Sequence, residues 1–280
     1  MRAAAILGPG SVAKSMIAFQ RATNVQWTSL IEQADVAVIF GGDGTVHGQL
    51  SEIVELGIPA LVVPCGSGND FARALGIRNV RDSINAWRNF VERGRSRTID
   101  LGMIRGEMSG AKAQKYFASV AGVGIDAAIA RRANALPQWL RARGGYALSA
   151  PREFLRFAPF PMKIRCNGTA AAFCPTILAA VANAPAYGGG MKIAPQAKLD
   201  DAKLDVCVVK AMDALKLFCL FPTVYFGRHL SFREVEYKQT SQVKLETESP
   251  VDVFADGEYV CQTPADFGVA RQALTVLVPD

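Results

Sequence analysis

The chain has 280 residues, 50% of them hydrophobic and 20% charged, and its formal net charge at pH 7 is +6. This length supports a large core in one or two domains, and the composition excludes an intrinsically disordered chain. The longest apolar run, Leu215–Phe226, contains Lys216 and Pro222 and is too short for a bilayer about 30 Å thick. The apolar part of the N-terminus is too short for a signal peptide and is expected to form a strand.

The numbers and spacing of the cysteines and histidines limit the kinds of metal site and disulfide that the chain can form. Six cysteines are scattered without a C-x-x-C pair, and the chain has only two histidines. This pattern argues against a disulfide framework and against a zinc site. We therefore expect a reduced, cytoplasmic protein.

Strand and helix patterns alternate in the first hundred residues. Such alternation predicts a parallel sheet with helices on its faces, and ligands bind at the carboxyl ends of strands in these sheets. The expected strands are Ala3–Leu7, Asp35–Phe40 and Pro59–Val63, and the expected helices are Ser11–Arg21, Thr45–Leu56, Asn69–Leu75 and Val80–Arg93.

A glycine-rich loop, GGDGT, follows the second of these strands and opens a helix. Its glycines permit a tight turn and close approach of a ligand to the backbone. Thr45 is a candidate N-cap, and the free N–H groups of the helix start form an anion site. The acid Asp43 suits a phosphate loop when a cation lies between carboxylate and phosphate. Read alone, the loop also fits a plain turn with a solvated Asp43.

A second glycine-rich loop, Gly66–Asp70, follows the third strand and again delivers one acid, Asp70, to a helix start. Two loops of this kind at neighbouring strand ends are a stronger signal than either loop alone. Together they predict a site for nucleotide phosphates and a divalent cation.

The pattern changes at about residue 95, after which short strands with turns predominate. These signals predict an antiparallel β domain. A polar loop is expected at Gly106–Gln114, a helix is expected to follow Gly122–Ala127, and Asp126 is expected to cap that helix or to serve catalysis. Further helices are expected at Pro137–Phe157 and Asp213–Phe226, and strands at Thr98–Ile104, Lys115–Ala121, Met162–Cys166, Thr176–Asn183, Leu204–Val209, Glu234–Tyr237, Val243–Thr247, Val251–Ala255 and Ala273–Val278.

Six stretches, in this order, resemble the catalytic family of diacylglycerol kinases, which includes soluble bacterial lipid kinases and the sphingosine and ceramide kinases. The resemblance runs nearly end to end, and the ordered set of motifs is highly specific. The stretches are GGDGTVH from Gly41, GSGNDFARALG from Gly66, IDLG at Ile99–Gly102, GVGIDA at Gly122–Ala127, NAPAYGGG at Asn183–Gly190 with PQAKLDDAKLDV at Pro195–Val206, and DGE at Asp256–Glu258.

The resemblance implies a phosphofructokinase- and NAD-kinase-like α/β domain with a parallel sheet, followed by a β-sandwich domain. We place these domains at residues 1–100 and 101–280, with the last residues packing back on the first domain. ATP is expected in the cleft between them, with Mg²⁺. The residues implied in nucleotide binding are Gly41, Gly42, Asp43, Gly44, Thr45, Gly66, Ser67, Gly68 and Asn69, with Ser11 as a further candidate.

The resemblance also assigns the acids. Asp256 is the implied general base on the acceptor hydroxyl, with Glu258 beside it, while Asp43 serves catalysis from the other side of the cleft. The implied ligands of the catalytic Mg²⁺ are Asp43, Asp70 and Asp100, and Asp201 is the implied ligand of a structural Mg²⁺.

Two positions depart from the family pattern. His47 stands where many members carry Asn, and a polar residue on the helix surface is as good a reading of it as a nucleotide contact. Ala202 replaces the usual glycine of the D-D-G sequence, which weakens the case for the structural metal.

The charge is concentrated in residues 131–165, which carry eight basic residues and one acid, so that this stretch sums to +7 and the rest of the chain to −1. Aromatic and aliphatic residues alternate with its arginines, a pattern typical of helices on an anionic membrane surface. A helix packed on the sandwich with solvated arginines is the alternative. No nucleic acid is expected as a partner, because no recognised binding motif accompanies the charge.

The sequence therefore predicts an ATP-dependent lipid kinase that phosphorylates a hydroxyl of a diacylglycerol-like lipid and associates peripherally with the membrane. A kinase for a sphingoid or another lipid, an NAD-kinase-like enzyme, and a non-catalytic nucleotide- or lipid-binding relative stay open. A homodimer is left open as an assembly.

Overall fold

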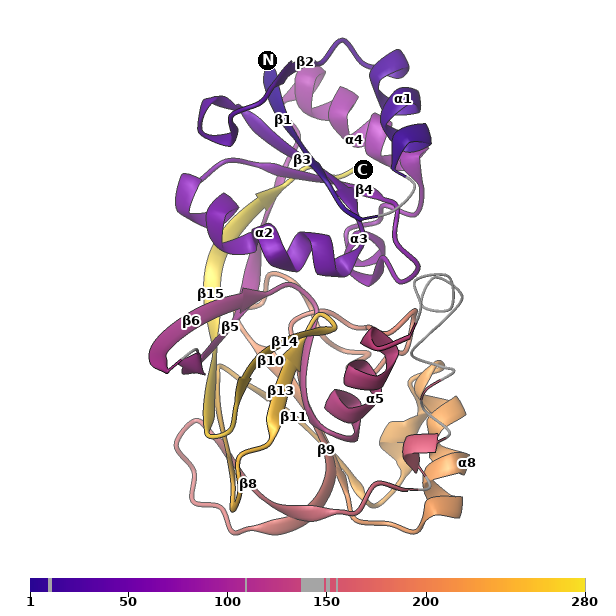
Figure 1. Ribbon diagram of the computed structural model, residues 1–280, viewed down its shortest axis with the longest axis vertical. Coiled ribbons are helices and arrows are strands. Elements are labelled where there is room, and N and C mark those ends of the chain that lie inside the picture. Colours follow the sequence, from indigo (N-terminus) through magenta and orange to yellow (C-terminus); the bar gives the residue numbers. More distant parts are fainter. Residues whose placement is uncertain (10–11, 109, 137–148, 150–151, 155, 280) are drawn as a thin grey trace.

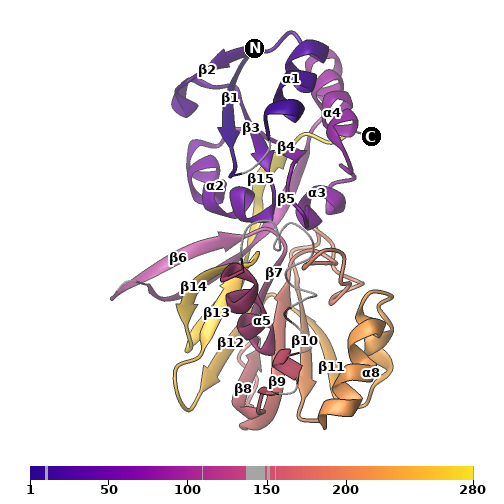
Figure 2. The same cartoon turned by 45° about the vertical axis from the view of Figure 1, so that its right-hand side comes forward.

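The computed structural model of the protein describes residues 1–9, 12–108, 110–136, 149, 152–154 and 156–279. Two lobes are stacked along the long axis of the molecule, and both views show β5 and β15 running between them (Figures 1 and 2). The N-terminal lobe contains β1 (Arg2–Leu7), α1 (Ala13–Ala22), β2 (Gln26–Thr28), a 3-10 helix (Ile31–Gln33), β3 (Val36–Gly41), α2 (Asp43–Leu56), β4 (Ala60–Pro64), α3 (Asp70–Ala74) and α4 (Val80–Arg93).

The predicted parallel sheet is confirmed. β1 pairs in parallel with β2 and β3, and β3 pairs in parallel with β4. Every residue of β3 is buried, as expected for a central strand with helices on both faces. Because β3 and β4 end side by side, the two glycine loops that follow them meet at one edge of the sheet.

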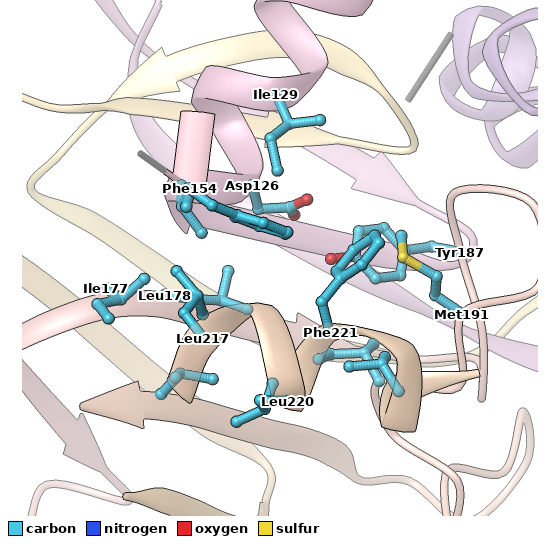
Figure 3. A pocket seen from close by; sticks show the side chains of 14 residues that line it. Asp126, Ile129, Phe154, Ile177, Leu178, Tyr187, Met191, Leu217, Leu220 and Phe221 are labelled. Carbon is cyan, nitrogen blue, oxygen red and sulfur yellow. The ribbon is translucent and has the colours of Figure 1, made fainter. Parts of the chain in front are cut away.

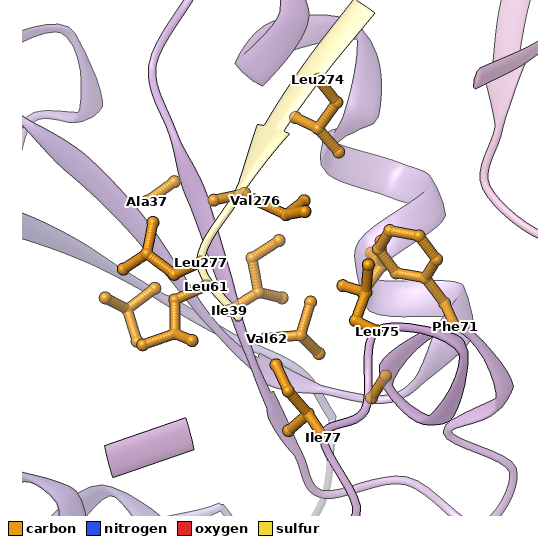
Figure 4. Close-up of a cluster of buried hydrophobic side chains, with 14 of the residues drawn as sticks. Ala37, Ile39, Leu61, Val62, Phe71, Leu75, Ile77, Leu274, Val276 and Leu277 are labelled. Carbon is orange, nitrogen blue, oxygen red and sulfur yellow. The ribbon is translucent and has the colours of Figure 1, made fainter. Parts of the chain in front are cut away.

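The end of the chain returns to this lobe. Val276 of β15 (Ala265–Val276) pairs in parallel with Ala60, and the Leu277 N–H donates to the Ala60 carbonyl at 2.9 Å. Leu274, Val276 and Leu277 lie inside the apolar core of the N-terminal lobe (Figure 4). Burial of these aliphatic side chains couples the folding of the two lobes.

The C-terminal lobe is a β-sandwich. One sheet follows the order β14-β13-β7-β9-β10-β11, and the other follows β8-β12-β15-β5-β6, with the start of β9 also pairing with β8. Its strands are β5 (Arg97–Met108), β6 (Ala111–Phe117), β7 (Val120–Gly124), β8 (Phe160–Cys166), β9 (Cys174–Ala182), β10 (Leu204–Lys210), β11 (Val235–Thr240), β12 (Gln242–Thr247), β13 (Asp252–Ala255), β14 (Glu258–Gln262) and β15.

Two helices, α5 (Ile125–Asn134) and α8 (Ala214–Val224), add a third layer on the outer face of the first sheet. Alternate residues of β10 belong to different cores, because Val206 faces the second sheet while Cys207 faces the helices. A 3-10 helix (Arg228–Ser231) follows α8.

Several predicted boundaries were wrong. The polar segment 106–114 is not a loop, since β5 and β6 continue through most of it as a hairpin. The strand expected at Lys115–Ala121 is broken after Phe117, because the next three backbone N–H groups donate to Asp256 and not to a neighbouring strand. The strand Glu258–Gln262 was not predicted.

Two other predictions fall on parts of the chain that the structure does not describe. Ser11 and most of the helix expected at Pro137–Phe157 lie outside the described residues. Within the part that is described, no helix is both long and apolar enough to cross a bilayer.

Candidate active site

The first glycine loop leads directly into α2, which begins at Asp43. The N-cap is Gly42 and not Thr45, because the N–H groups of Thr45 and Val46 already donate to the Gly42 carbonyl at 3.0 and 3.1 Å. The N–H groups of Asp43 and Gly44 precede the first helical hydrogen bonds, so they are the ones available to an anion.

The side chain of Thr45 does not cap α2 but packs against two glycines. A Cβ added to Gly8 or to Gly41 would lie 2.3 or 2.4 Å from the Thr45 Oγ1 atom, so this hydroxyl packs against both glycines. Gly8 and Gly41 therefore leave room for the side chain of Thr45 at the ends of β1 and β3.

The second loop is closed by its own asparagine. The Gly66 N–H donates to Asn69 Oδ1 at 2.9 Å, and Asn69 Nδ2 donates to the Gly66 carbonyl at 2.6 Å. Asn69 adopts a left-handed conformation with φ 54° before α3 begins. The amide of Asn69 thus holds the loop shape, while Ser67 at the loop tip is exposed. The nucleotide contacts of Ser67 and Asn69 stay predictions.

Asp43 and Asp70 converge where the two loops meet. Asp43 accepts hydrogen bonds from the N–H groups of Asp70 and Phe71 at 3.1 and 3.0 Å, and so joins α2 to the start of α3. Burial, followed by the negative charges of Asp70 and Asp256, raises the pKa of Asp43 to about 6. Arg73 balances part of the Asp70 charge at 2.6 Å.

These two acids fit the implied Mg²⁺. A Cβ added to Gly68 would lie 2.7 Å from Asp43 Oδ2 and 3.5 Å from Asp70 Oδ2, so both oxygens face the same side of Gly68. Carboxylate oxygens are the ligands that Mg²⁺ prefers, and a cation between them would offset the repulsion that raises the pKa of Asp43. Among the described side chains, no three potential ligands already form a metal cluster.

Asp100 occupies a different environment. Its carboxylate accepts the N–H of Gln272 at 2.8 Å and the N–H of Ala202 at 2.7 Å. Both donors have positive φ values, 49° and 57°, so Asp100 stabilises two strained turns where the lobes join. Its role toward Mg²⁺ stays a prediction.

Asp201 has an acidic neighbour that the sequence interpretation missed. The negative charge of Asp201 adds to burial in raising the pKa of Asp205. Asp205 is fully buried, and its Oδ2 atom has no hydrogen-bond partner. An orphaned buried carboxylate oxygen beside a second acid fits a cation site, so Asp205 joins Asp201 as a candidate ligand of the predicted structural Mg²⁺.

The D-G-E motif forms the tight turn between β13 and β14. Asp256 and Gly257 have φ values of 51° and 88°, which is why an Asp-Gly pair suits this two-residue hairpin. The Asp256 carboxylate accepts the N–H groups of Ala118, Ser119 and Val120 at 2.8, 2.8 and 3.2 Å.

This turn rests on the first two turns of α2. His47 Nδ1 lies 3.2 Å from Asp256 Oδ2, and a Cβ added to Gly44 would lie 2.6 Å from Glu258 Oε1. His47 is therefore an interlobe contact, and its reading as a plain surface residue was wrong. The structure brings both acids of the turn to the helix that starts at Asp43.

An apolar pocket with a cavity volume of about 40 Å³ lies in the C-terminal lobe, between the outer face of the first sheet and helices α5 and α8 (Figure 3). Asp126 and Tyr187 are its only polar lining residues among those that the structure describes. Asp126 is the second residue of α5, whose N-cap is Gly124, so the predicted capping role was wrong. The other lining residues are Ile125, Ile129, Phe154, Ile177, Leu178, Met191, Ile193, Val209, Leu217, Leu220, Phe221 and Val224.

One short loop connects this pocket to the acids. The N–H of Gly189 donates to Asp70 Oδ2 at 2.7 Å, while Tyr187 and Met191, two residues to either side, line the pocket. Burial raises the pKa of Tyr225, at the end of α8, and the negative charge of Asp70 adds to this shift. The 187–191 loop thus links one wall of the pocket to Asp70 at the start of α3.

A parallel α/β lobe with two phosphate-type loops, closed by a β-sandwich that presents acids to them, defines a two-lobed kinase fold. Residues 15–104 match the diacylglycerol kinase catalytic domain, and residues 119–278 match the YegS C-terminal NAD kinase beta sandwich-like domain. The chain belongs to the diacylglycerol kinase family, which confirms the resemblance seen in its motifs.

Individual relatives agree with this assignment. The chain is 33% identical over 245 residues to a diacylglycerol kinase of Mycobacterium tuberculosis, covering 88% of this chain and 77% of the relative. It is 26% identical to a diacylglycerol kinase of Bacillus subtilis, covering 92% and 82% of the two chains.

Solved structures share the fold at lower identity. A diacylglycerol kinase from Bacillus anthracis superimposes with a TM-score of 0.66 at 18% identity, over 99% of this chain and 96% of that chain. An NAD kinase from Archaeoglobus fulgidus in complex with ATP gives a TM-score of 0.54 at 13% identity, over 100% and 94%. The predicted fold class, an NAD-kinase-like α/β lobe followed by a β-sandwich, is confirmed.

Proposed function

We propose that this protein is an ATP-dependent kinase that transfers the γ-phosphate of ATP to a hydroxyl of a diacylglycerol-like lipid. The observation that carries this proposal is the hydrogen bond from the Gly189 N–H to Asp70, which joins the apolar pocket to the phosphate-type loops. A pocket lined almost entirely by hydrocarbon suits acyl chains, whereas the polar groups of NAD would lose their hydrogen bonds there.

The donor side is assigned to the two glycine loops. The free N–H groups at the start of α2 would bind phosphate oxygens, and Asp43 and Asp70 would hold Mg²⁺. When bound, the metal supplies charge neutralisation for the transferred phosphoryl group. The acid that receives the proton of the acceptor hydroxyl is assigned to the D-G-E turn. This turn packs against α2, the helix whose N-terminus is assigned to the phosphates.

The acceptor side is assigned to the pocket under α5 and α8. Peripheral association with an anionic membrane, through residues 131–165, would bring a bilayer lipid to it. In the described part of this stretch, Arg165 pairs at 2.8 Å with Glu246 and Arg131 pairs with Asp252, and both acids lie outside the stretch, so its unpaired charge is smaller than the sequence sum of +7. Membrane docking accordingly stays a proposal.

The test is a transfer assay with γ-labelled ATP and purified protein, with and without Mg²⁺. Dioctanoylglycerol, a long-chain diacylglycerol in mixed micelles, sphingosine, ceramide and NAD are offered separately. We expect label in phosphatidate that depends on Mg²⁺ and is lost in Asp43→Asn. Label in NAD, or ATP binding without transfer to any acceptor, would overturn the proposal in favour of an NAD kinase or a non-catalytic relative.

A further inference from the structure

A second cavity lies inside the β-sandwich, between its two sheets. Its volume is about 300 Å³, at the lower end of the range of small-molecule sites. Among the described residues, it shares no lining side chain with the apolar pocket under α5 and α8. β10 separates the two spaces, because Val208 lines the cavity while Val209, on the opposite face of the strand, lines the pocket. The cavity is therefore separate from the pocket assigned to the acceptor.

Two diverging strands open this cavity. β9 pairs with β8 through Cys174–Thr176 and then continues beside β7 and β10 in the first sheet. β8 instead continues beside β12 in the second sheet. Apolar side chains line the wedge between the two sheets, with Ile164 on the β8 side and Val206 and Val208 on the β10 side. The interior of the cavity thus suits a hydrocarbon chain.

The connection from β8 to β9, residues 167–173, closes one side of the cavity. Residues 169–172 line it with small side chains, which leave the volume unfilled. The start of the connection is anchored on the turn between β11 and β12. Asn167 Oδ1 accepts the Thr240 hydroxyl at 2.7 Å and the Gln242 N–H at 3.2 Å, and the Asn167 N–H donates to the Gln242 carbonyl at 2.9 Å. These bonds fix the wall at the end of the C-terminal lobe away from the N-terminal lobe, where β8 lies (Figures 1 and 2).

The mouth of the cavity is charged. Lys210 of β10 and Glu236 and Lys238 of β11 line it, and their side chains are 41% to 65% exposed. The Glu236 carboxylate lies 2.5 Å from Lys210 Nζ and 3.8 Å from Lys238 Nζ. Two ammonium groups and one carboxylate sum to +1, so the mouth favours an anion with one negative charge. Inward-pointing charges on an edge strand such as β11 also discourage pairing with another chain, but that role leaves the cavity behind them unexplained.

Two thiols report on the same space, because Cys166 and Cys174 both line the cavity. Burial raises the pKa of the Cys166 thiol, while the charge of Lys238 lowers it and the charge of Glu236 raises it further. The Cys166 thiol therefore lies within electrostatic reach of the charged mouth. A molecule that fills the cavity would cover both thiols.

We propose that this cavity binds a fatty acid, with the alkyl chain between the sheets and the carboxylate at Lys210 and Lys238. Burial of the chain against the apolar walls supplies the hydrophobic contribution, and one negative charge matches the net charge of the mouth. A volume at the lower end of the range suits a single chain. The inference does not depend on the proposed kinase function, because the cavity lies on the other face of β10 from the acceptor pocket.

The experiment measures the rates at which N-ethylmaleimide alkylates Cys166 and Cys174 in the full chain, by mass spectrometry of peptides. Dodecanoate, dodecyltrimethylammonium and acetate are added separately, below micelle-forming concentrations. Only dodecanoate should slow both reactions, roughly tenfold at about ten times the half-protecting concentration. Cys219, which is exposed on α8 and does not line the cavity, is the internal reference and should react at an unchanged rate.

Variants of the mouth should shift the half-protecting concentration of dodecanoate in opposite directions. Replacing both lysines, Lys210→Gln with Lys238→Gln, should raise it about tenfold or more, because the carboxylate loses both charged donors. Glu236→Gln removes the competing carboxylate and should lower it about twofold to fivefold. Lys112→Gln, at an exposed position on β6 outside the cavity lining, is the matched control and should behave as wild type.

A third variant tests the chain site and leaves the mouth intact. Val208→Trp fills the cavity from β10 and should abolish the effect of dodecanoate on the two thiols, and its melting temperature shows whether it folds. The inference is overturned by any of four results with dodecanoate or its analogues. These are no protection by dodecanoate, equal protection by dodecyltrimethylammonium or by acetate, equal slowing at Cys219, and an unchanged half-protecting concentration in the double lysine variant.

Discussion

Gly42 and Gly66 lie backbone to backbone, one just after β3 and the other just after β4. A Cβ added to Gly66 would lie 2.6 Å from the Cα of Gly42, and a Cβ added to Gly42 would lie 3.0 Å from the Cα of Gly66. The two phosphate-type loops are therefore packed against each other, and neither position has room for a methyl group without a backbone shift.

Gly66→Ala should separate the two loops and displace Asp43 from the start of α3. A misplacement of about 1 Å at a catalytic site costs roughly 10²-fold in rate, so we expect a fall in turnover of that order. Steady-state kinetics with dioctanoylglycerol measure it. Gly48→Ala in α2 is the control, because its Cβ would meet nothing within 4 Å. Equal activity of the two variants would contradict the packing argument.

Leu217→Trp should fill part of the apolar pocket. We expect the KM for a long-chain diacylglycerol to rise about tenfold or more, while the KM for ATP stays unchanged. Leu215→Trp makes the same change on α8 at a position that is 76% exposed, outside the pocket lining. If Leu217→Trp left the lipid KM unaltered, the acceptor site would lie elsewhere.

Ala202→Gly should stabilise the protein. Ala202 has a φ of 57°, a left-handed conformation in which a Cβ is unfavourable, and its N–H donates to Asp100. Removing the Cβ should raise the free energy of unfolding by about 1 kcal/mol, as measured by chemical denaturation. A destabilised variant would show that the alanine methyl group makes compensating contacts.

His229 should make stability sensitive to acid. It is fully buried, its Nε2–H donates to the Ile193 carbonyl at 3.1 Å, and burial lowers its pKa below the ordinary value of 6.5. As the pH falls through that ordinary value, the unfolded chain binds a proton that folded His229 resists. The stability contributed by the neutral imidazole is therefore lost as the pH falls.

The check is the melting temperature at about pH 7.5 and pH 5.5 for the wild type and His229→Gln. The variant should lose less stability between the two values, because glutamine does not titrate. A parallel decline in both proteins would rule out His229 as a source of the acid sensitivity.

The family motifs and the local chemistry of the glycine loops were determined by the sequence itself. Strand periodicity predicted β1, β3 and β4, and one carboxylate delivered by each glycine loop predicted that Asp43 and Asp70 would converge. These inferences succeeded because they depend on neighbours within a few residues and on the shared edge of a parallel sheet.

Only the tertiary structure decided the environment of each acid. Asp256 and Glu258 are two residues apart, yet one is enclosed by N–H groups of residues 118–120, between β6 and β7, and by His47, while the other is exposed beside Gly44. The partners of Asp256 lie 136 to 209 positions away along the chain. Hydrogen-bond saturation depends on such distant donors, and no local pattern encodes where they come together.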